Sequence, residues 1–134
     1  MSARLVLLAA LADVVFVTGF ALTGRLSHEE HPLLGLWTTA WPFLAALAVG
    51  WLITLAWRAP TAPLRTGVGV WAVTLAGGML LRAASGQGTA PAFIIVAAIV
   101  LALTLVGWRA VAALVRRRRL VTGAAAGAGA SGGA

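Results

Sequence analysis

The chain contains four apolar stretches, and each is long enough, or nearly long enough, to cross a lipid bilayer. They cover residues 5–23, 34–57, 66–82 and 90–115. A helix rises about 1.5 Å per residue, so about 20 apolar residues cross the hydrocarbon region of a membrane. An open strand would leave backbone amides unpaired in lipid. We therefore predict an all-α protein, an antiparallel four-helix transmembrane bundle.

The composition is that of a protein that lies in lipid. Hydrophobic residues make up 61% of the chain, and the mean hydropathy is +0.99. Soluble proteins contain only about 45 to 50% apolar residues. The net charge is +7, and four of the basic residues form the run Arg116, Arg117, Arg118 and Arg119, directly after the last apolar stretch. Such a run anchors a helix to anionic lipid headgroups, so we expect the bilayer as a partner and no nucleic acid.

Arginines at the ends of the stretches predict the orientation. One side would carry eight of them: Arg4, Arg58, Arg65, Arg109 and Arg116 to Arg119. The other side would carry Arg25 and Arg82, beside Glu29 and Glu30. Basic residues are in excess on the cytoplasmic side. We expect a multi-pass protein of the plasma membrane with both termini in the cytoplasm.

The chain divides into one transmembrane domain, residues 1–120, and a tail, residues 121–134. The tail consists mainly of glycine and alanine. It has no large side chain with which to offset the entropy lost on ordering, so we expect it to be disordered.

Asp13 is the polar residue that most needs an explanation. It lies eight residues after Leu5, which places it about 12 Å inside the hydrocarbon region. An ionised carboxylate at that depth costs about 2.5 to 3.5 kcal/mol. Asp13 must therefore be protonated, face water or pair with a partner, such as a backbone group, Thr74 or an arginine. Two interpretations remain: a structural bond between helices, and a role in moving protons or ions.

Other polar residues are expected near Asp13 in the outer half of the bundle. Arg82 ends the third stretch at an axial offset of about 10 Å from Asp13, which a long arginine side chain could nearly bridge. Pro42 has no N–H to donate to the carbonyl of Thr38, so it should kink the second stretch. The predicted intramembrane cluster comprises Asp13, Thr39, Arg82 and Gln87, packed around the kink at Trp41 and Pro42. Arg25 could compete for Asp13, and both arginines could instead extend to the outer headgroups.

The outer loops offer only weak signals for ligands. Gln87 lies in a glycine-rich turn, Ser85 to Thr89, that could hold an anion together with Arg82 or simply join two helices. His28 belongs to a run, His28-Glu29-Glu30-His31, without a further metal ligand on a regular scaffold. The chain has no cysteine and no catalytic motif. We expect no enzyme activity, no metal and no cofactor.

Several short motifs together resemble the bacterial and archaeal membrane family catalogued as domain of unknown function 3054. The motifs are Asp13-Val14, Gly24-Arg25 with Ser27-His28, Thr39-Ala40-Trp41-Pro42-Phe43, Gly50-Trp51, Gly78 to Arg82, Gly86 to Thr89, and Gly107-Trp108-Arg109. The resemblance covers about residues 5–109. It implies a four-span integral membrane protein and no known activity.

Two functions fit these features. The first is a structural or accessory membrane protein whose polar cluster specifies how the helices pair, as a monomer or a homo-oligomer. The second is a small proton-coupled transporter or channel subunit, in which Asp13 exchanges protons and Arg82 attracts an anionic solute.

Overall fold

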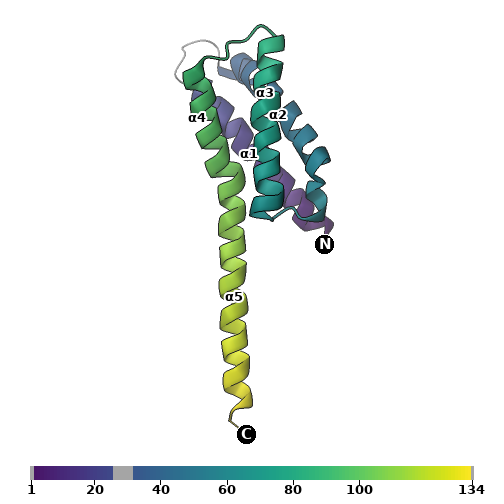
Figure 1. Ribbon diagram of the computed structural model, residues 1–134, viewed down its shortest axis with the longest axis vertical. Coiled ribbons are helices and arrows are strands. Elements are labelled where there is room, and N and C mark those ends of the chain that lie inside the picture. The colour runs from purple at the N-terminus through teal and green to yellow at the C-terminus, as the bar shows by residue number, and fades with distance from the viewer. Residues whose placement is uncertain (1, 26–31, 134) are drawn as a thin grey trace.

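The described residues form an all-helical fold in the computed structural model, which covers residues 2–25 and 32–133. The main helices are α1 (Ala3–Arg25), α2 (Pro32–Thr54), α3 (Gly69–Ala84), α4 (Pro91–Leu101) and α5 (Gly107–Ser131). A 3-10 turn, η1 (Ala56–Arg58), and two π-helical segments, η2 (Pro63–Val68) and η3 (Ala102–Val106), lie between them. Figure 1 shows that α4, η3 and α5 follow one another as one long helix.

Four segments of the described chain are long and apolar enough to cross a membrane. They are Ala3–Gly24, Gly35–Thr54, Pro63–Ala84 and Pro91–Ser131. Four helices that could cross a membrane are therefore present in the described chain, and their ends differ from those of the four predicted stretches. The second span ends before Trp57, because Leu55 adopts a left-handed conformation with φ 52° and Pro60, which lacks an N–H to continue a helix, follows five residues later. The third begins earlier than expected, with Pro63 in its first turn, where proline loses no hydrogen bond.

The glycine- and alanine-rich tail is helical in the structure, in contrast to the predicted disorder. Helix α5 continues through the arginine run to Ser131, and residues 116–133 are exposed. Alanine has the highest helix propensity of all residues. Extending an existing helix also avoids the cost of nucleating a new one. The tail thus continues α5 without any packing against the bundle.

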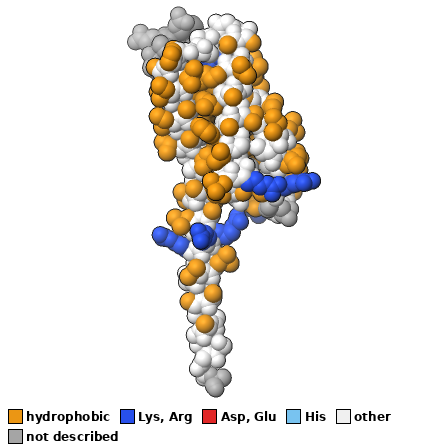
Figure 2. All heavy atoms as spheres, viewed as in Figure 1, with side chains coloured by type: hydrophobic (Ala, Val, Ile, Leu, Met, Phe, Trp, Pro, Cys, Tyr) orange, Lys and Arg blue, Asp and Glu red, His pale blue; other side chains and the backbone are white. Residues whose placement is uncertain are grey.

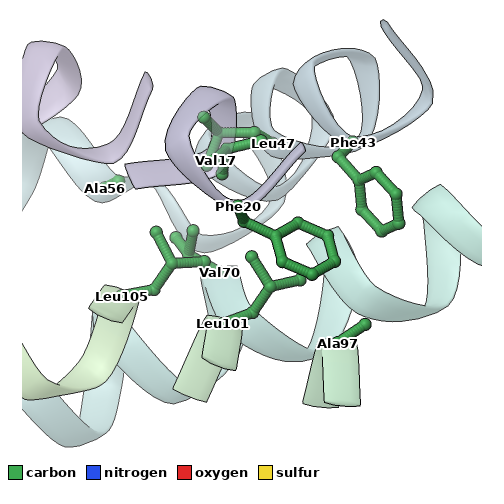
Figure 3. Packing of buried hydrophobic residues seen from close by; sticks show 9 residues of the cluster. All are labelled: Val17, Phe20, Phe43, Leu47, Ala56, Val70, Ala97, Leu101 and Leu105. Atoms are coloured by element: carbon green, nitrogen blue, oxygen red, sulfur yellow. The ribbon is translucent and has the colours of Figure 1, made fainter. Parts of the chain in front are cut away.

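Side chains from α1, α2, α3 and the long last helix meet in one core (Figure 3). The buried members are Val17, Phe20, Phe43, Leu47, Ala56, Val70, Ala97, Leu101 and Leu105. Phe20 packs edge to face on Phe43, with ring centroids 5.3 Å apart. The apolar core therefore holds these four helical segments together.

Small residues allow α2 and α3 to approach each other closely. A Cβ on Gly78 would overlap the ring of Phe43, and a Cβ on Gly77 would come within 2.9 Å of the Cβ of Ala46. Gly50 faces Val70 and Val73 of α3 at ordinary contact distance. Close contact of small residues is the usual way in which helices associate in lipid. The glycines of α3, and not its exposed alanines 72 and 76, make this contact.

The outer surface of the bundle is largely apolar (Figure 2). Its most exposed large hydrophobic residues include Leu7, Leu52, Ile53, Leu64, Leu80 and Leu103, each more than 60% exposed. Arginine side chains gather where α5 leaves the bundle and on the part of α5 beyond it. An apolar girdle with arginines at one end is compatible with a membrane protein.

Candidate functional site

Asp13 forms a fully buried ion pair with Arg109. Both side chains have 0% exposure. Arg109 donates from Nη1 to Oδ1 of Asp13 at 2.9 Å and from Nη2 to Oδ2 at 2.6 Å. This two-pronged geometry matches the planar guanidinium to the carboxylate and makes both bonds charge-assisted. The pair joins α1 to α5, across 96 residues of sequence.

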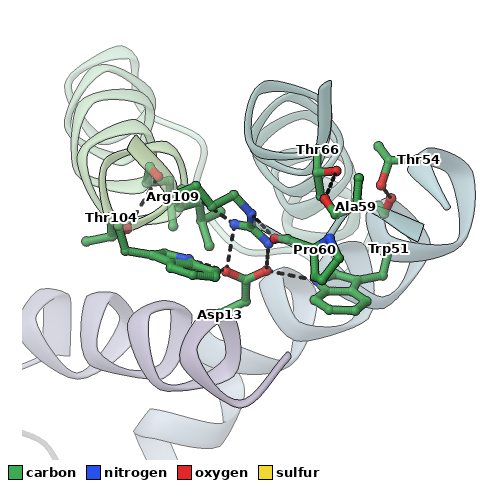
Figure 4. Close-up of polar contacts among 12 residues, drawn as sticks. Asp13, Trp51, Thr54, Ala59, Pro60, Thr66, Thr104 and Arg109 are labelled. Atoms are coloured by element: carbon green, nitrogen blue, oxygen red, sulfur yellow. Dashed lines mark hydrogen bonds and ion pairs between the residues drawn. The ribbon is translucent and has the colours of Figure 1, made fainter. Parts of the chain in front are cut away.

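Two tryptophans complete the coordination of the carboxylate (Figure 4). Trp51 of α2 donates from Nε1 to Oδ2 of Asp13 at 2.8 Å. Trp108 of α5 donates from Nε1 to Oδ1, also at 2.8 Å. Each oxygen of Asp13 therefore accepts two hydrogen bonds, and the carboxylate is well satisfied without water.

Arg109 also holds backbone carbonyls from two other parts of the chain. Its Nε donates to the carbonyl of Pro60 at 2.8 Å, and its Nη1 donates to the carbonyl of Leu105 at 2.7 Å. The guanidinium carbon lies 4.6 Å from the centre of the Trp108 ring, within cation–π distance. Arg109 thus ties together α1, the segment between α2 and α3, and the last helix.

The irregular segment between α2 and α3 is shaped to receive Arg109. Pro60 and Thr66 are buried, and the Thr66 hydroxyl donates to the carbonyl of Ala59 at 2.6 Å. Non-helical backbone is tolerated at membrane depth only where protein or water satisfies it. Gly67 lies in η2 against the last helix, and a Cβ there would come within 3.2 Å of Cδ of Arg109. A residue larger than glycine would press on the arginine side chain.

The energetic role of the pair follows from its burial. Replacing a buried ion pair by apolar residues is often neutral or stabilising, but removing one partner costs about 3 to 5 kcal/mol because the other charge is left unpaired. The pair therefore contributes little to the net free energy of unfolding. Its main effect is to disfavour other arrangements of these helices, in which one of the two charges would be buried without its partner. Chemically, the site can hold helices in register, and its two charges compensate each other.

A second polar cluster, separate from the first, surrounds Arg82 at the end of α3. Arg82 donates from Nε and Nη2 to the carbonyl of Gly88, at 3.1 and 2.9 Å, and from Nη1 to Oε1 of Gln87 at 3.0 Å. Its guanidinium carbon lies 4.4 Å from the centre of the Phe93 ring. Gln87 in turn donates from Nε2 to the carbonyl of Thr38 at 3.0 Å. This cluster connects the α3–α4 turn to α2.

Pro42 explains why the carbonyl of Thr38 accepts a side-chain hydrogen bond. In a regular helix that carbonyl would accept from the backbone N–H of residue 42, which proline lacks. The side-chain amide of Gln87 supplies a donor instead. Helix α2 remains continuous through Pro42, which is buried together with the neighbouring Phe43.

The predicted cluster of four residues is thus divided in the structure. Asp13 pairs with Arg109, whereas Arg82 bonds to Gln87 as expected and to Gly88. The expected meeting of Asp13 and Arg82 is not observed, because Arg82 turns to the carbonyl groups of its own turn and Arg109 occupies both oxygens of Asp13. Thr39 lines a groove together with Arg82 and Gln87.

The other predicted residues are distributed as follows. Trp41 is half-buried next to Pro42 in α2. Arg25 is the last residue of α1, and His28 lies outside the described residues. Arginines 116 to 119 are all exposed on α5, where Arg116 donates to the hydroxyl of Thr61 at 2.8 Å. Within the part of the chain that the structure describes, no three His, Cys, Asp or Glu side chains form a group that could hold a metal ion.

Sequence reasoning did not single out Arg109, Trp51 or Trp108 as site residues. From the sequence, Arg109 is expected at the cytoplasmic boundary of the last span, together with the arginine run. The signal that distinguishes it is the stretch of apolar residues 110–115, which separates it from Arg116. Seven residues of helix place Arg109 about 10 Å deeper than Arg116. Trp51 and Trp108 belong to the family motifs, but their side chains are neutral, so the sequence alone does not indicate that they bind a carboxylate.

Comparison with known proteins gives a family for this all-helical protein with membrane-spanning helices. Residues 10–112 match the family described as "Protein of unknown function (DUF3054)". The match covers most of the chain, so the protein belongs to this family, and the predicted resemblance is confirmed. It includes Asp13 and Arg109, which lie near its two ends. No curated protein and no solved structure matches the chain.

Proposed function

We propose that this protein is a structural or accessory protein of the plasma membrane, without catalytic activity, in which the Asp13–Arg109 pair determines how the helices pack. The observation that carries the proposal is the complete coordination of the Asp13 carboxylate, which accepts two hydrogen bonds at each oxygen. Four donors from α2 and α5 converge on one residue of α1. Such a site specifies a single arrangement of helices, because any other arrangement would leave a charge unpaired in lipid.

The same coordination favours a structural role over proton transfer. A residue that carries protons must alternate between two protonation states and reach water. Asp13 has 0% exposure, and neutralising it would leave the equally buried Arg109 guanidinium without its counter-charge. Proton exchange at Asp13 would therefore require the bundle to open.

The proposed topology is an antiparallel bundle with both termini in the cytoplasm. With Arg109 buried in the bundle, seven arginines still lie on the proposed cytoplasmic side: Arg4, Arg58, Arg65 and Arg116 to Arg119. Arg25 and Arg82 remain on the other side. The excess supports the same orientation. In this orientation the arginine run of α5 lies at anionic headgroups, with each arginine contributing about 1 kcal/mol of attraction.

The alternative is a proton-coupled transporter or channel subunit that uses Asp13 and Arg82. A groove lined in part by Arg82 runs along α1, the helix that bears Asp13. This function would require Asp13 to exchange Arg109 for a solute or a proton during each cycle.

Proton flux and folding, measured on the same variants, distinguish these functions. The wild type, Asp13→Asn and the double variant Asp13→Asn/Arg109→Gln are reconstituted into liposomes that contain a pH-sensitive dye. Thermal unfolding is measured on the same proteins in detergent, with Arg65→Gln as an exposed control. We expect no proton flux in any of them, strong destabilisation of Asp13→Asn, and partial recovery in the double variant, which carries no unpaired charge at this site.

A wild-type flux that is lost in a well-folded Asp13→Asn protein would overturn the structural proposal and establish the transporter. A reporter enzyme fused to the C-terminus checks the topology separately. Activity of the reporter outside the cytoplasm would contradict the proposed orientation.

A further inference from the structure

A groove lies between α1 and α4, and neither Asp13 nor Arg109 lines it. It has a volume of about 1050 Å³, at the upper end of the range of about 300 to 1,000 Å³ that is typical of ligand sites. Apolar side chains form most of its walls, among them Phe16 and Phe20 of α1 and Phe93, Val96 and Val100 of α4. Gly19 widens the groove, because a Cβ there would meet no atom within 4 Å. The long, apolar shape suits a hydrocarbon chain.

One end of this groove is polar and positively charged. Arg82, Gln87 and Thr39 line it there, near the turn between α3 and α4. Arg82 uses three of its five N–H donors on Gln87 and Gly88, which leaves one donor on each terminal nitrogen. Among the described residues, no carboxylate forms an ion pair with Arg82, since Asp13 is paired with Arg109. A fixed guanidinium with two remaining donors suits an oxygen anion such as phosphate.

We propose that the groove binds an anionic phospholipid, with one acyl chain between α1 and α4 and the phosphate at Arg82. The walls of the groove include Val15 and Val96, which belong to the exposed apolar surface of the bundle, and the charge of Arg82 is opposite to that of the headgroup. A second copy of this chain would complement it poorly, because the chain carries a net charge of +7 and has only three acidic residues, of which Asp13 is buried. This binding activity goes beyond the packing role of the Asp13–Arg109 pair and does not depend on it.

Photolabelling with a defined lipid tests the site. The full chain is reconstituted in phosphatidylcholine nanodiscs that contain a small fraction of phosphatidylglycerol with a diazirine on one acyl chain. A matched phosphatidylcholine probe serves as the neutral counterpart. Labelled peptides are mapped by mass spectrometry in the wild type and in Arg82→Gln, Gly19→Leu, Gly123→Leu and a variant with Arg116 to Arg119 changed to glutamine. Gly123→Leu adds the same side chain in an exposed part of α5.

We expect the phosphatidylglycerol probe to label α1 and α4 about tenfold more than the neutral probe. A tenfold difference corresponds to about one charge-assisted hydrogen bond, which the anionic lipid makes to Arg82 and the neutral lipid lacks. Arg82→Gln should remove this preference, and Gly19→Leu should block labelling by both probes. Gly123→Leu and the variant without the arginine run should behave like the wild type at the groove.

Three results would overturn the proposal. Equal labelling by the two probes would show a groove without headgroup recognition. Loss of the preference only when the arginine run is changed would assign it to α5. Failure of both probes to label α1 and α4, in a wild type that size-exclusion chromatography shows to be a dimer, would show that a second copy fills the groove. Unfolding curves of Gly19→Leu exclude loss of the fold as the cause of a negative result.

Discussion

The Asp13 carboxylate draws its four hydrogen bonds from donors that differ in charge. Two come from the Arg109 guanidinium and two from the neutral indoles of Trp51 and Trp108. The indoles add no charge, so they stabilise the carboxylate without disturbing the balance of the ion pair. Each tryptophan also presents a large apolar ring to its surroundings, which suits a polar centre inside a membrane protein.

We predict that Trp51→Phe and Trp108→Phe each lower the free energy of unfolding by about 1 to 3 kcal/mol, because each removes one hydrogen bond to a buried charge while keeping an aromatic ring. Unfolding in a mixed detergent series, followed by circular dichroism, measures the change. Trp37→Phe is the control, since Trp37 is 67% exposed. Equal stability of the two site variants and the control would show that the indole N–H groups contribute nothing.

The contact between α2 and α3 requires the backbone of α3 to lie close to the side chains of α2, which is possible only where α3 has glycine. Phe43 fills the space that a side chain at position 78 would need. Phe43 also packs against Phe20 of α1, so the position of α3 affects the core on the other side of α2. The same closeness brings the α3–α4 turn to α2, where Gln87 reaches the carbonyl of Thr38.

We predict that Gly78→Ala destabilises the bundle by about 1 to 3 kcal/mol, because the added methyl group must displace Phe43. Gly19→Ala in α1 is the matched control. Its methyl group meets open space, so the higher helix propensity of alanine should make this variant equal to the wild type or more stable. Thermal unfolding of both variants in the same detergent gives the comparison. A stable Gly78→Ala protein would contradict the close approach of α2 and α3.

The molecule as a whole consists of a bundle and a single helix that extends beyond it (Figure 1). The part of α5 beyond the arginine run is exposed along its length. In contrast, Arg109 near the start of α5 has contacts with α1, with Pro60 and with η3. The stability of the bundle should therefore depend on the beginning of α5 and not on its end.

Truncation tests this division. Removing residues 120–134 should change the free energy of unfolding by no more than about 0.5 kcal/mol, which is the range of exposed substitutions. Ending the chain after Trp108 removes Arg109 and should prevent assembly of a folded bundle, because Asp13 is left as an unpaired charge. Size-exclusion chromatography and thermal unfolding report both outcomes. An unfolded protein after the shorter truncation would assign a packing role to the tail.

Several features follow from the sequence because they depend on local physics. Apolar length predicts the four spans, since a helix must satisfy its backbone over the thickness of the bilayer. Pro42 predicts that the carbonyl of Thr38 needs another donor, since that loss lies within one helical turn. The depth of Asp13 predicts that it needs a partner, because a lone carboxylate in hydrocarbon is costly. These statements require only positions along one helix.

Which partner Asp13 takes was decided by the tertiary structure. A simple depth estimate favours Arg82, with Arg25 as a competitor, because Arg109 is expected at the cytoplasmic boundary of the last span. The choice depends on the π-helical segments η2 and η3, on the close approach of Gly67, and on the carbonyl of Pro60, which together accommodate the guanidinium of Arg109. These groups come from segments far apart in the chain. Only the packed helices bring them together, because an ion pair forms where both charges are buried and all their donors and acceptors are satisfied at once.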